Sequence, residues 1–176
     1  MVVPLSSRKD PQSVEPSGKR VGQLIDGVVV RDAVTHEDER GDLTEIYDPA
    51  WGIMEAPLVY VYQTTIRPGR VKGWVYHKLQ HDRLFVSNGW LKIVLYDMRP
   101  ASPTHGLVNE IFASERRRRL VTIPPLVLHA VENLGLNEGV FVNMPTRPYN
   151  HADPDKYRVA LDAPDVPYSF DKGRGW

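Results

Sequence analysis

The stretch GWVYHKLQHDRLFVSNG, residues Gly73–Gly89, decides the fold of this chain. Val75 and His77 are two positions apart, so on a strand their side chains point to the same face of a sheet. Asp82 follows on the next bend, and Gly89 ends a second β-rich run. A histidine, an acid and a glycine at this spacing are typical of a β-barrel that binds a metal or a sugar. In such a motif, Val75 stands where a first histidine belongs.

The residues around this stretch continue the β pattern in both directions. The run RLFVSNGWLKIVLYDM is predicted to form a β-hairpin, because Asn88-Gly89 supplies the positive φ that a tight turn needs. Further runs rich in β-branched and aromatic residues lie at 58–67, 110–114, 119–124 and 139–146. No long segment has a helical period, so the sequence predicts an all-β antiparallel sandwich or barrel.

A chain of 176 residues is most simply one domain. Residues 1–20 are rich in Ser, Pro, Lys and Arg, and we expect them to form a flexible N-terminal arm. Residues 21–176 are predicted to form a single domain. It includes a tail from Tyr149 onward that is rich in Pro and Asp and expected to be irregular.

Composition excludes several classes of function. Lys plus Arg and Asp plus Glu each number 22, so no net charge attracts the chain to nucleic acid or to an anionic membrane. The chain has no cysteine, which excludes disulfides, thiolate metal ligands and a cysteine nucleophile. No apolar run approaches the roughly 20 residues that span a bilayer, and the N-terminus lacks the apolar core of a signal peptide. We therefore expect a cytoplasmic protein with no nucleic-acid or membrane partner.

A second segment, PPLVLHAVEN, strengthens the interpretation of the first. Its Pro124, His129 and Asn133 fit the second motif of the cupin barrels, with Leu126 in place of a glycine. The stretch Gly73–Gly89 resembles the first cupin motif. Two partial matches in the right order predict a cupin jelly-roll barrel or sandwich with irregular N- and C-terminal arms.

A longer resemblance covers roughly residues 32–157. The chain resembles the dTDP-4-dehydrorhamnose 3,5-epimerase family, a jelly-roll branch of the cupins that works without metal. The segment DMRPASPTHG is the most specific match, because generic cupins lack it. The other matching segments are ERGDLTEIY, KGWVYH, SNGWLKIVLY, TIPPLVLHAV and FVNMPTRPYN.

This resemblance implies a nucleotide-sugar substrate, a homodimer, and neither a metal nor another cofactor. It places Arg40, Glu45 and Gln63 in contact with the nucleotide part of the ligand. Lys72 stands where the family has a phosphate-contacting arginine, so the charge is kept without the bidentate fork. His129 matches an active-site histidine of the family.

The departures from the family concern catalysis. The family's general base is a histidine at the position of Val75, and its general acid is a tyrosine at the position of Asn143. Its substrate-contacting lysine aligns with Asp82, although Arg83 is adjacent. Epimerisation beside a ketone needs a base and an acid, and neither valine nor an amide supplies either. We assign Arg83 and Asn143 to substrate binding.

Other residues are available to replace the lost pair. His77 shares the inward face with Val75, and Asp82 is placed to orient it as a carboxylate orients a histidine base. Tyr149 is the candidate acid nearest in sequence to Asn143. The predicted catalytic set is therefore His77, Asp82, His129 and Tyr149.

Three functions remain open at this point. The first, which we favour, is an isomerase or epimerase of nucleotide-linked keto-sugars with a relocated base. Its ordinary 3,5-epimerase activity would be lost or altered. The second is a non-catalytic protein that binds sugar nucleotides, as a partner of an active enzyme. The third is a metal-dependent cupin, because His77, Asp82 and His129 would suit Fe(II) or Zn(II).

Overall fold

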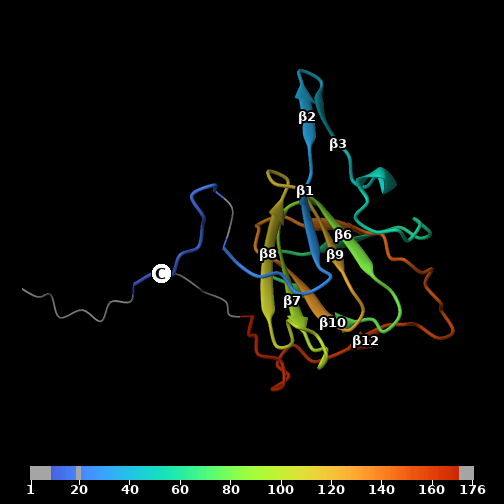
Figure 1. Ribbon diagram of the computed structural model, residues 1–176. Coiled ribbons are helices and arrows are strands. Elements are labelled where there is room, and N and C mark those ends of the chain that lie inside the picture. Colours follow the sequence, from blue (N-terminus) through green and yellow to red (C-terminus); the bar gives the residue numbers. More distant parts are fainter. Residues whose placement is uncertain (1–8, 19–20, 171–176) are drawn as a thin grey trace, which may run out of the picture.

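The computed structural model describes residues 9–18 and 21–170, and its regular structure there is almost entirely β (Figure 1). Two antiparallel five-stranded sheets pack face to face, as the alternating strands predicted. The first sheet has the order β1-β9-β6-β11-β4 and the second the order β12-β5-β10-β7-β8. Within these residues, no helix is both long enough and apolar enough to cross a membrane.

The strands have the following bounds. The first sheet contains β1 (Val29–Asp32), β4 (Tyr62–Ile66), β6 (Asp82–Asn88), β9 (Arg119–Ile123) and β11 (Gly139–Asn143). The second contains β5 (Val71–Tyr76), β7 (Trp90–Asp97), β8 (Val108–Ser114), β10 (Val127–Asn133) and β12 (Tyr157–Arg158). A separate hairpin joins β2 (Thr35–Asp38) to β3 (Gly41–Thr44), and one 3-10 turn, η1, spans Pro49–Trp51.

The core lies between the two sheets. Ile93 and Leu95 from β7 meet Val121 and Ile123 from β9, and all four side chains are fully or almost fully buried. Phe141 from β11 adds an aromatic ring at one side. Strand alternation thus sends one set of side chains from each sheet into a shared apolar layer.

The prediction of a β-hairpin at Asn88-Gly89 is wrong, because the two strands do not pair with each other. β6 lies in the first sheet between β9 and β11, whereas β7 lies in the second between β10 and β8. Gly89 does have a positive φ of 81°, but it turns the chain from one sheet to the other. A tight turn between two β-rich runs has the same local sequence in both cases. Which sheet each strand joins depends on its neighbours.

The hairpin β2–β3 projects away from the two sheets (Figure 1). Its two strands pair only with each other. Leu43 remains 61% exposed on it, and Arg40 at the turn pairs with Asp38. No residue of β2 is buried. This hairpin is therefore a protrusion of the sandwich and not part of its core.

The segment DMRPASPTHG forms a hydrogen-bonded loop between β7 and β8. The buried Asp97 carboxylate accepts hydrogen bonds from Arg99 at 2.8 Å, Ser102 at 2.6 Å and Thr104 at 2.6 Å. Although burial acts to raise the pKa of Asp97, these donors lower it far below its usual value. Arg99 and Thr104 also bind the backbone of Asp26 at 2.8 and 2.9 Å. The segment that carries the most specific resemblance thus anchors the N-terminal part of the domain.

The C-terminal tail packs against a second apolar cluster, which side chains of β5, β7 and β10 form on the second sheet. It is largely irregular, as expected, but it packs closely. Tyr168 and Phe170 lie against Trp74, with ring centroids at 5.9 and 5.1 Å, and the Trp74 side chain is completely buried. Of the predicted N-terminal arm, residues 1–8 and 19–20 lie outside the described residues, and residues 9–18 are exposed.

Candidate active site

Two adjoining cavities open around the end of β5. The first, which we call the barrel cavity, has a volume of about 320 Å³ and lies between the two sheets. The second, the loop cavity, has a volume of about 330 Å³ and is walled largely by the loops at 79–80 and 145–153. Tyr62, His77 and Lys156 line both cavities, so these three side chains form the boundary between them.

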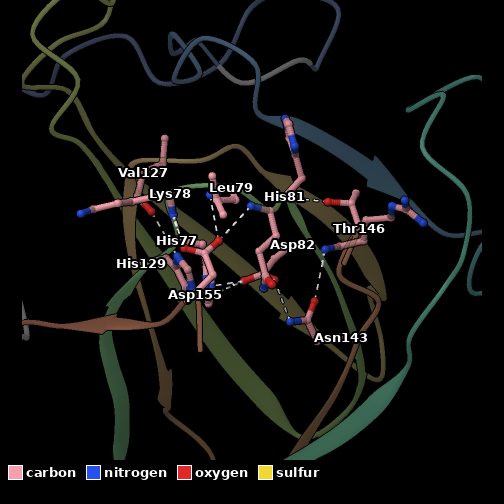
Figure 2. A network of polar contacts seen from close by, with 12 residues as sticks. His77, Lys78, Leu79, His81, Asp82, Val127, His129, Asn143, Thr146 and Asp155 are labelled. Atoms are coloured by element: carbon pink, nitrogen blue, oxygen red, sulfur yellow. Dashed lines mark hydrogen bonds and ion pairs between the residues drawn. The ribbon is translucent and has the colours of Figure 1, made fainter. Parts of the chain in front are cut away.

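A buried cluster of one carboxylate and two imidazoles forms a wall of the barrel cavity (Figure 2). Asp82 Oδ2 lies 3.2 Å from His77 Nε2 and 3.4 Å from His129 Nε2. Asp82 is only 2% exposed, and each histidine is 8% exposed. The three side chains come from the start of β6, the residue after β5 and the middle of β10. Asp82 and His77 are therefore in contact, the arrangement that the expected orienting role of Asp82 requires.

The C-terminal tail fixes the orientation of His77. The Asp155 backbone carbonyl oxygen can only accept, so His77 Nδ1 donates to it and Nε2 is left to face Asp82. The Asp155 carboxylate accepts three backbone N–H groups, from Lys78 and Leu79 at 2.8 Å and from Gln80 at 3.1 Å. Figure 2 shows Asp155 between this loop and His77. One tail residue thus holds both the ring and the loop that follows it.

Electrostatics give the two histidines different properties. Burial acts to raise the pKa of Asp82, but hydrogen bonding to His77 and the nearby imidazoles lower it to about 2, so it is ionised. Burial opposes protonation of His77, but the hydrogen bond and charge of Asp82 outweigh it and raise its pKa. For His129 burial dominates and lowers the pKa. The site therefore favours a proton on His77 and a neutral His129.

Three cationic side chains also line the barrel cavity: Lys72 on β5, Lys156 before β12, and Arg158 on β12. The pKa of Lys156 is lowered, first by burial and then by repulsion from Arg158 and Lys72, against a smaller attraction to Asp82. Neighbouring cations that repel one another favour an anionic ligand between them. A phosphate or diphosphate group is the matching chemistry.

Asn143 joins the buried cluster to a phenol. Its Nδ2 donates to Asp82 Oδ1 at 3.0 Å and to the Tyr62 hydroxyl oxygen at 2.9 Å. Val75 lines the same cavity directly across the β5–β10 pairing from His129. Position 75 thus presents an apolar wall, and position 143 presents a hydrogen-bond donor.

The structure brings together part of the predicted site. His77, Asp82, His129, Lys72 and Asn143 all line the barrel cavity. Tyr149 lines the loop cavity, where the residue is 43% exposed and its ring centroid lies 4.9 Å from that of His151.

Four predicted substrate-binding residues lie outside both cavities. Arg83 points to the opposite face of β6, where it is fully buried and donates to the carbonyl oxygens of Ala56 at 2.8 Å and Pro57 at 3.1 Å. Strand alternation turns Gln63 outward on β4. Arg40 lies at the turn of the projecting hairpin, and the exposed Glu45 follows β3.

The sequence interpretation missed four residues of the site: Tyr62, Asp155, Lys156 and Arg158. For Tyr62 a signal existed, because alternation in LVYVYQTTIR places Tyr62 and Thr64 on one face. The other three residues lie in the irregular tail, where no periodic pattern predicts a contact.

The cluster also has the composition of a metal site. One ligand atom from each of His77, Asp82 and His129 lies within 4.8 Å of the others. His129 Nδ1 lies 3.1 Å from the Val127 carbonyl oxygen, so both histidines have their Nδ1 atoms on backbone carbonyls and present Nε2 to the shared carboxylate. Such outer contacts are usual for ligating histidines, so the residues fit a divalent cation.

The fold and the interior site define a jelly-roll barrel of the cupin class, with a cavity that buried titratable side chains line. A protein-family model described as the polysaccharide biosynthesis C-terminal domain matches residues 36–157. The chain belongs to this family.

Individual relatives agree with this assignment. A probable low-salt glycan biosynthesis epimerase, Agl13 from Haloferax volcanii, is 30% identical over 139 residues, which cover 78% of this chain and 89% of the relative. The solved dTDP sugar isomerase of Desulfovibrio desulfuricans is 25% identical, with a TM-score of 0.72 over 82% of this chain and 91% of that one.

A third similarity concerns the fold alone. The dTDP-4-dehydrorhamnose 3,5-epimerase of Sulfolobus tokodaii has a TM-score of 0.69 at 23% identity, over 84% of this chain and 85% of that one. The resemblance inferred from the sequence, and the cupin jelly roll that it implied, are confirmed.

Proposed function

We propose that this protein is an epimerase or isomerase that acts beside the ketone of a nucleotide-diphospho-4-keto-sugar. The observation that carries the proposal is the pairing of His77 and Asp82, 3.2 Å apart in a buried cavity that three cationic side chains also line. The imidazole supplies a base for a carbon-bound proton, and the cations suit the diphosphate. The names of the relatives, which include a probable glycan biosynthesis epimerase and a dTDP sugar isomerase, support the same class of reaction.

In the proposed reaction the neutral form of His77, in which Nδ1 donates to the Asp155 carbonyl oxygen, takes the proton from the carbon beside the ketone at Nε2. The electron pair of the broken C–H bond forms the carbon–carbon double bond of an enolate, and the charge moves to the former ketone oxygen. The imidazolium that results is stabilised by the adjacent carboxylate of Asp82. His129, which stays neutral, and Lys156 lie on the same cavity and are placed to bind the polar groups of the sugar.

Val75 and Asn143 bear on which reaction is possible. Valine has no titratable group, and an amide does not deliver a proton as a phenol does. We therefore propose that ordinary double epimerisation of dTDP-4-keto-6-deoxyglucose is absent or reduced to a trace. Proton exchange at one carbon beside the ketone would remain.

Exchange of solvent deuterium into dTDP-4-keto-6-deoxyglucose, followed by NMR, tests this function. We expect exchange at one carbon in the wild-type protein and a loss of about 10²-fold or more in His77→Ala, the scale of losing a general base. His105→Ala is the matched control, because His105 is exposed on the β7–β8 loop and lines neither cavity. Exchange in His77→Ala at the wild-type rate would contradict the relocated base. Ligand binding without any exchange would instead favour the non-catalytic binding protein.

A metal-dependent cupin is the second candidate. The observation that favours it is that one potential ligand atom from each of His77, Asp82 and His129 lies within 4.8 Å of the other two. A bound cation would supply Lewis-acid stabilisation of an enolate or bind a small acid. Elemental analysis and melting curves with a chelator separate the candidates. We expect well under one equivalent of Fe, Zn, Mn or Ni and an unchanged melting temperature. A stoichiometric metal that is lost in His129→Ala would overturn this expectation.

We also propose that the protein is a homodimer. Arg40, Glu45 and Gln63 lie outside both cavities of their own chain. If they contact the nucleotide, as the family resemblance implies, the contact comes from a second copy of the chain. Sedimentation velocity over a range of concentrations measures the assembly. A monomer at all concentrations would contradict the dimer and the assignment of these three residues together.

A further inference from the structure

Tyr62 lines both cavities, and none of the sequence motifs assigns a role to it. It lies at the start of β4, and its side chain lines both the barrel cavity and the loop cavity. Its neighbour Gln63 points out of the sheet, and Thr64 points in again. Strand alternation therefore directs this phenol inward, towards the same space that His77 borders.

The hydrogen bonds of Asn143 determine whether the Tyr62 hydroxyl group donates or accepts in their contact. Asn143 Oδ1 accepts the backbone N–H of Arg83 at 3.2 Å, which leaves Nδ2 to donate to Asp82 and Tyr62. Because Nδ2 is a donor, the Tyr62 oxygen is the acceptor in their 2.9 Å contact. The phenolic proton is thus left for another partner. Among residues 9–18 and 21–170 no protein group accepts it, so it is available to a ligand in the cavity.

Tyr62 and His77 approach the cavities from opposite walls. Tyr62 belongs to β4 in the first sheet, whereas His77 follows β5 in the second sheet. Inverting a stereocentre requires that a proton leave one face of the carbon and that another arrive on the opposite face. A sugar ring held between the two sheets would meet an imidazole on one face and a phenol on the other.

A hydrogen-bonded chain also connects the two groups. Tyr62 oxygen accepts from Asn143 Nδ2, which donates to Asp82 Oδ1, and Asp82 Oδ2 faces His77 Nε2. Asn143 and Tyr62 are direct cross-strand partners on β11 and β4. The family's tyrosine is missing at position 143, but a phenol stands one strand away on the same face of the sheet. Burial and the charge of Asp82 raise the pKa of Tyr62 to about 12, which keeps the phenol protonated at neutral pH.

We propose that Tyr62 is the general acid that protonates the substrate carbon on the face opposite His77, a role that rests on the proposed function. The Tyr62 O–H bond breaks, its proton forms the new C–H bond, and the enolate electrons restore the ketone. Tyr62 is left as a phenolate and His77 as an imidazolium. Between turnovers water returns a proton to the phenolate and accepts one from the imidazolium, so the reaction consumes nothing. Tyr149, the acid expected from the sequence, lines only the loop cavity, and within residues 9–18 and 21–170 no hydrogen bond joins it to Tyr62, Asn143 or Asp82.

The test compares proton removal with inversion in the same protein. dTDP-4-keto-6-deoxyglucose deuterated beside the ketone is incubated in H2O with wild-type protein, Tyr62→Phe or Tyr149→Phe. NMR then measures loss of deuterium and formation of the epimer separately. In Tyr62→Phe we expect deuterium loss with retention to persist and the kcat for the epimer to fall by about 10²-fold or more. If Tyr62 is the acid, Tyr149→Phe should show no selective loss of inversion relative to deuterium loss, and equal melting temperatures would show that all three proteins are folded.

Different results overturn different claims. An epimer formed by Tyr62→Phe at the wild-type rate, or a selective loss of inversion in Tyr149→Phe, would overturn the role of Tyr62 while leaving His77 as the base. A rise in KM with an unchanged kcat in Tyr62→Phe would show that the hydroxyl group only binds substrate, and this too would overturn the acid. Neither deuterium loss nor inversion in the wild-type protein would overturn the proposed function, and the role of Tyr62 with it.

Discussion

Replacing Asp82 by asparagine tests the electrostatics of the buried cluster. The substitution is isosteric, and the amide oxygen can still accept from Gln80 and Asn143, which both lie 3.0 Å from Asp82 Oδ1. At the other position an NH2 group replaces the carboxylate oxygen that faces His77 and His129. The fold should therefore be kept while the negative charge is lost.

The size of the effect follows from the contact distance. An opposite charge within about 4–6 Å shifts a pKa by about one to three units, and Asp82 Oδ2 lies 3.2 Å from His77 Nε2. We expect the pKa of His77 to fall by that amount in Asp82→Asn. Each unit is worth about 1.4 kcal/mol. The imidazolium formed on proton abstraction is less stable by the same amount, so exchange should slow by about 10- to 10³-fold.

The same substitution changes how stability depends on pH. The pKa of Asp82 is lowered from 3.8 to about 2, so its contribution is present above the unfolded value and is lost as pH falls towards 2. This contribution is about 2 kcal/mol at neutral pH. The pKa of His77 is raised, so its stabilisation is present below 6.5 and is lost as pH rises through its folded value. In Asp82→Asn the slope that Asp82 contributes should disappear, and the stabilisation that His77 contributes below pH 6.5 should be lost, because burial then lowers its pKa without opposition from Asp82.

Histidine ring NMR spectra recorded across pH 4–9, urea unfolding between pH 2 and 8, and deuterium exchange measure the three effects. Asp165→Asn is the matched control. Asp165 is exposed in the C-terminal tail, lines neither cavity and was not predicted to belong to the site. It should reproduce the wild-type protein in every measurement. If His77 titrates in Asp82→Asn as it does in the wild type, the coupling inferred from the 3.2 Å contact is refuted.

Three further predictions concern other parts of the molecule. Arg83→Lys removes a guanidinium that donates to two loop carbonyls outside the cavities. Urea unfolding should show a loss of about 1.5–3 kcal/mol with an unchanged KM, and the reverse pattern would restore a substrate-binding role. Gly73→Ala places a Cβ 2.3 Å from Ala130 Cβ and should cost about 1–3 kcal/mol. Gly22→Ala, with no atom within 4 Å, should stay within about 0.5 kcal/mol in the same thermal unfolding assay. Finally, kcat/KM should rise with pH through the raised pKa of His77, with a midpoint above 6.5, because only the neutral imidazole is a base. A profile that is flat from pH 5 to 8 would contradict this.

Local sequence was sufficient for the β fold and for the centre of the site. Alternation and turn residues act within a few positions, so they predicted an all-β sandwich without reference to distant contacts. His77 and Asp82 are separated by one short loop, and His129 lies within an independent motif. The inward direction of these three side chains follows from strand geometry and from motif spacing. The three side chains that the sequence singled out lie together in the structure, with His77 and Asp82 in contact.

Contacts between distant segments were decided only by the tertiary structure. Asn88-Gly89 carries the same local signal in a hairpin as in a turn between sheets, and the packing of β6 and β7 against other strands selects the latter. Tyr62 meets Asn143 because β4 pairs with β11, across 81 positions of sequence. Asp155 reaches His77 across 78 positions, from a tail with no periodic pattern. Pairing and register of this kind arise when whole sheets bury their apolar faces together, so they are properties of the complete chain.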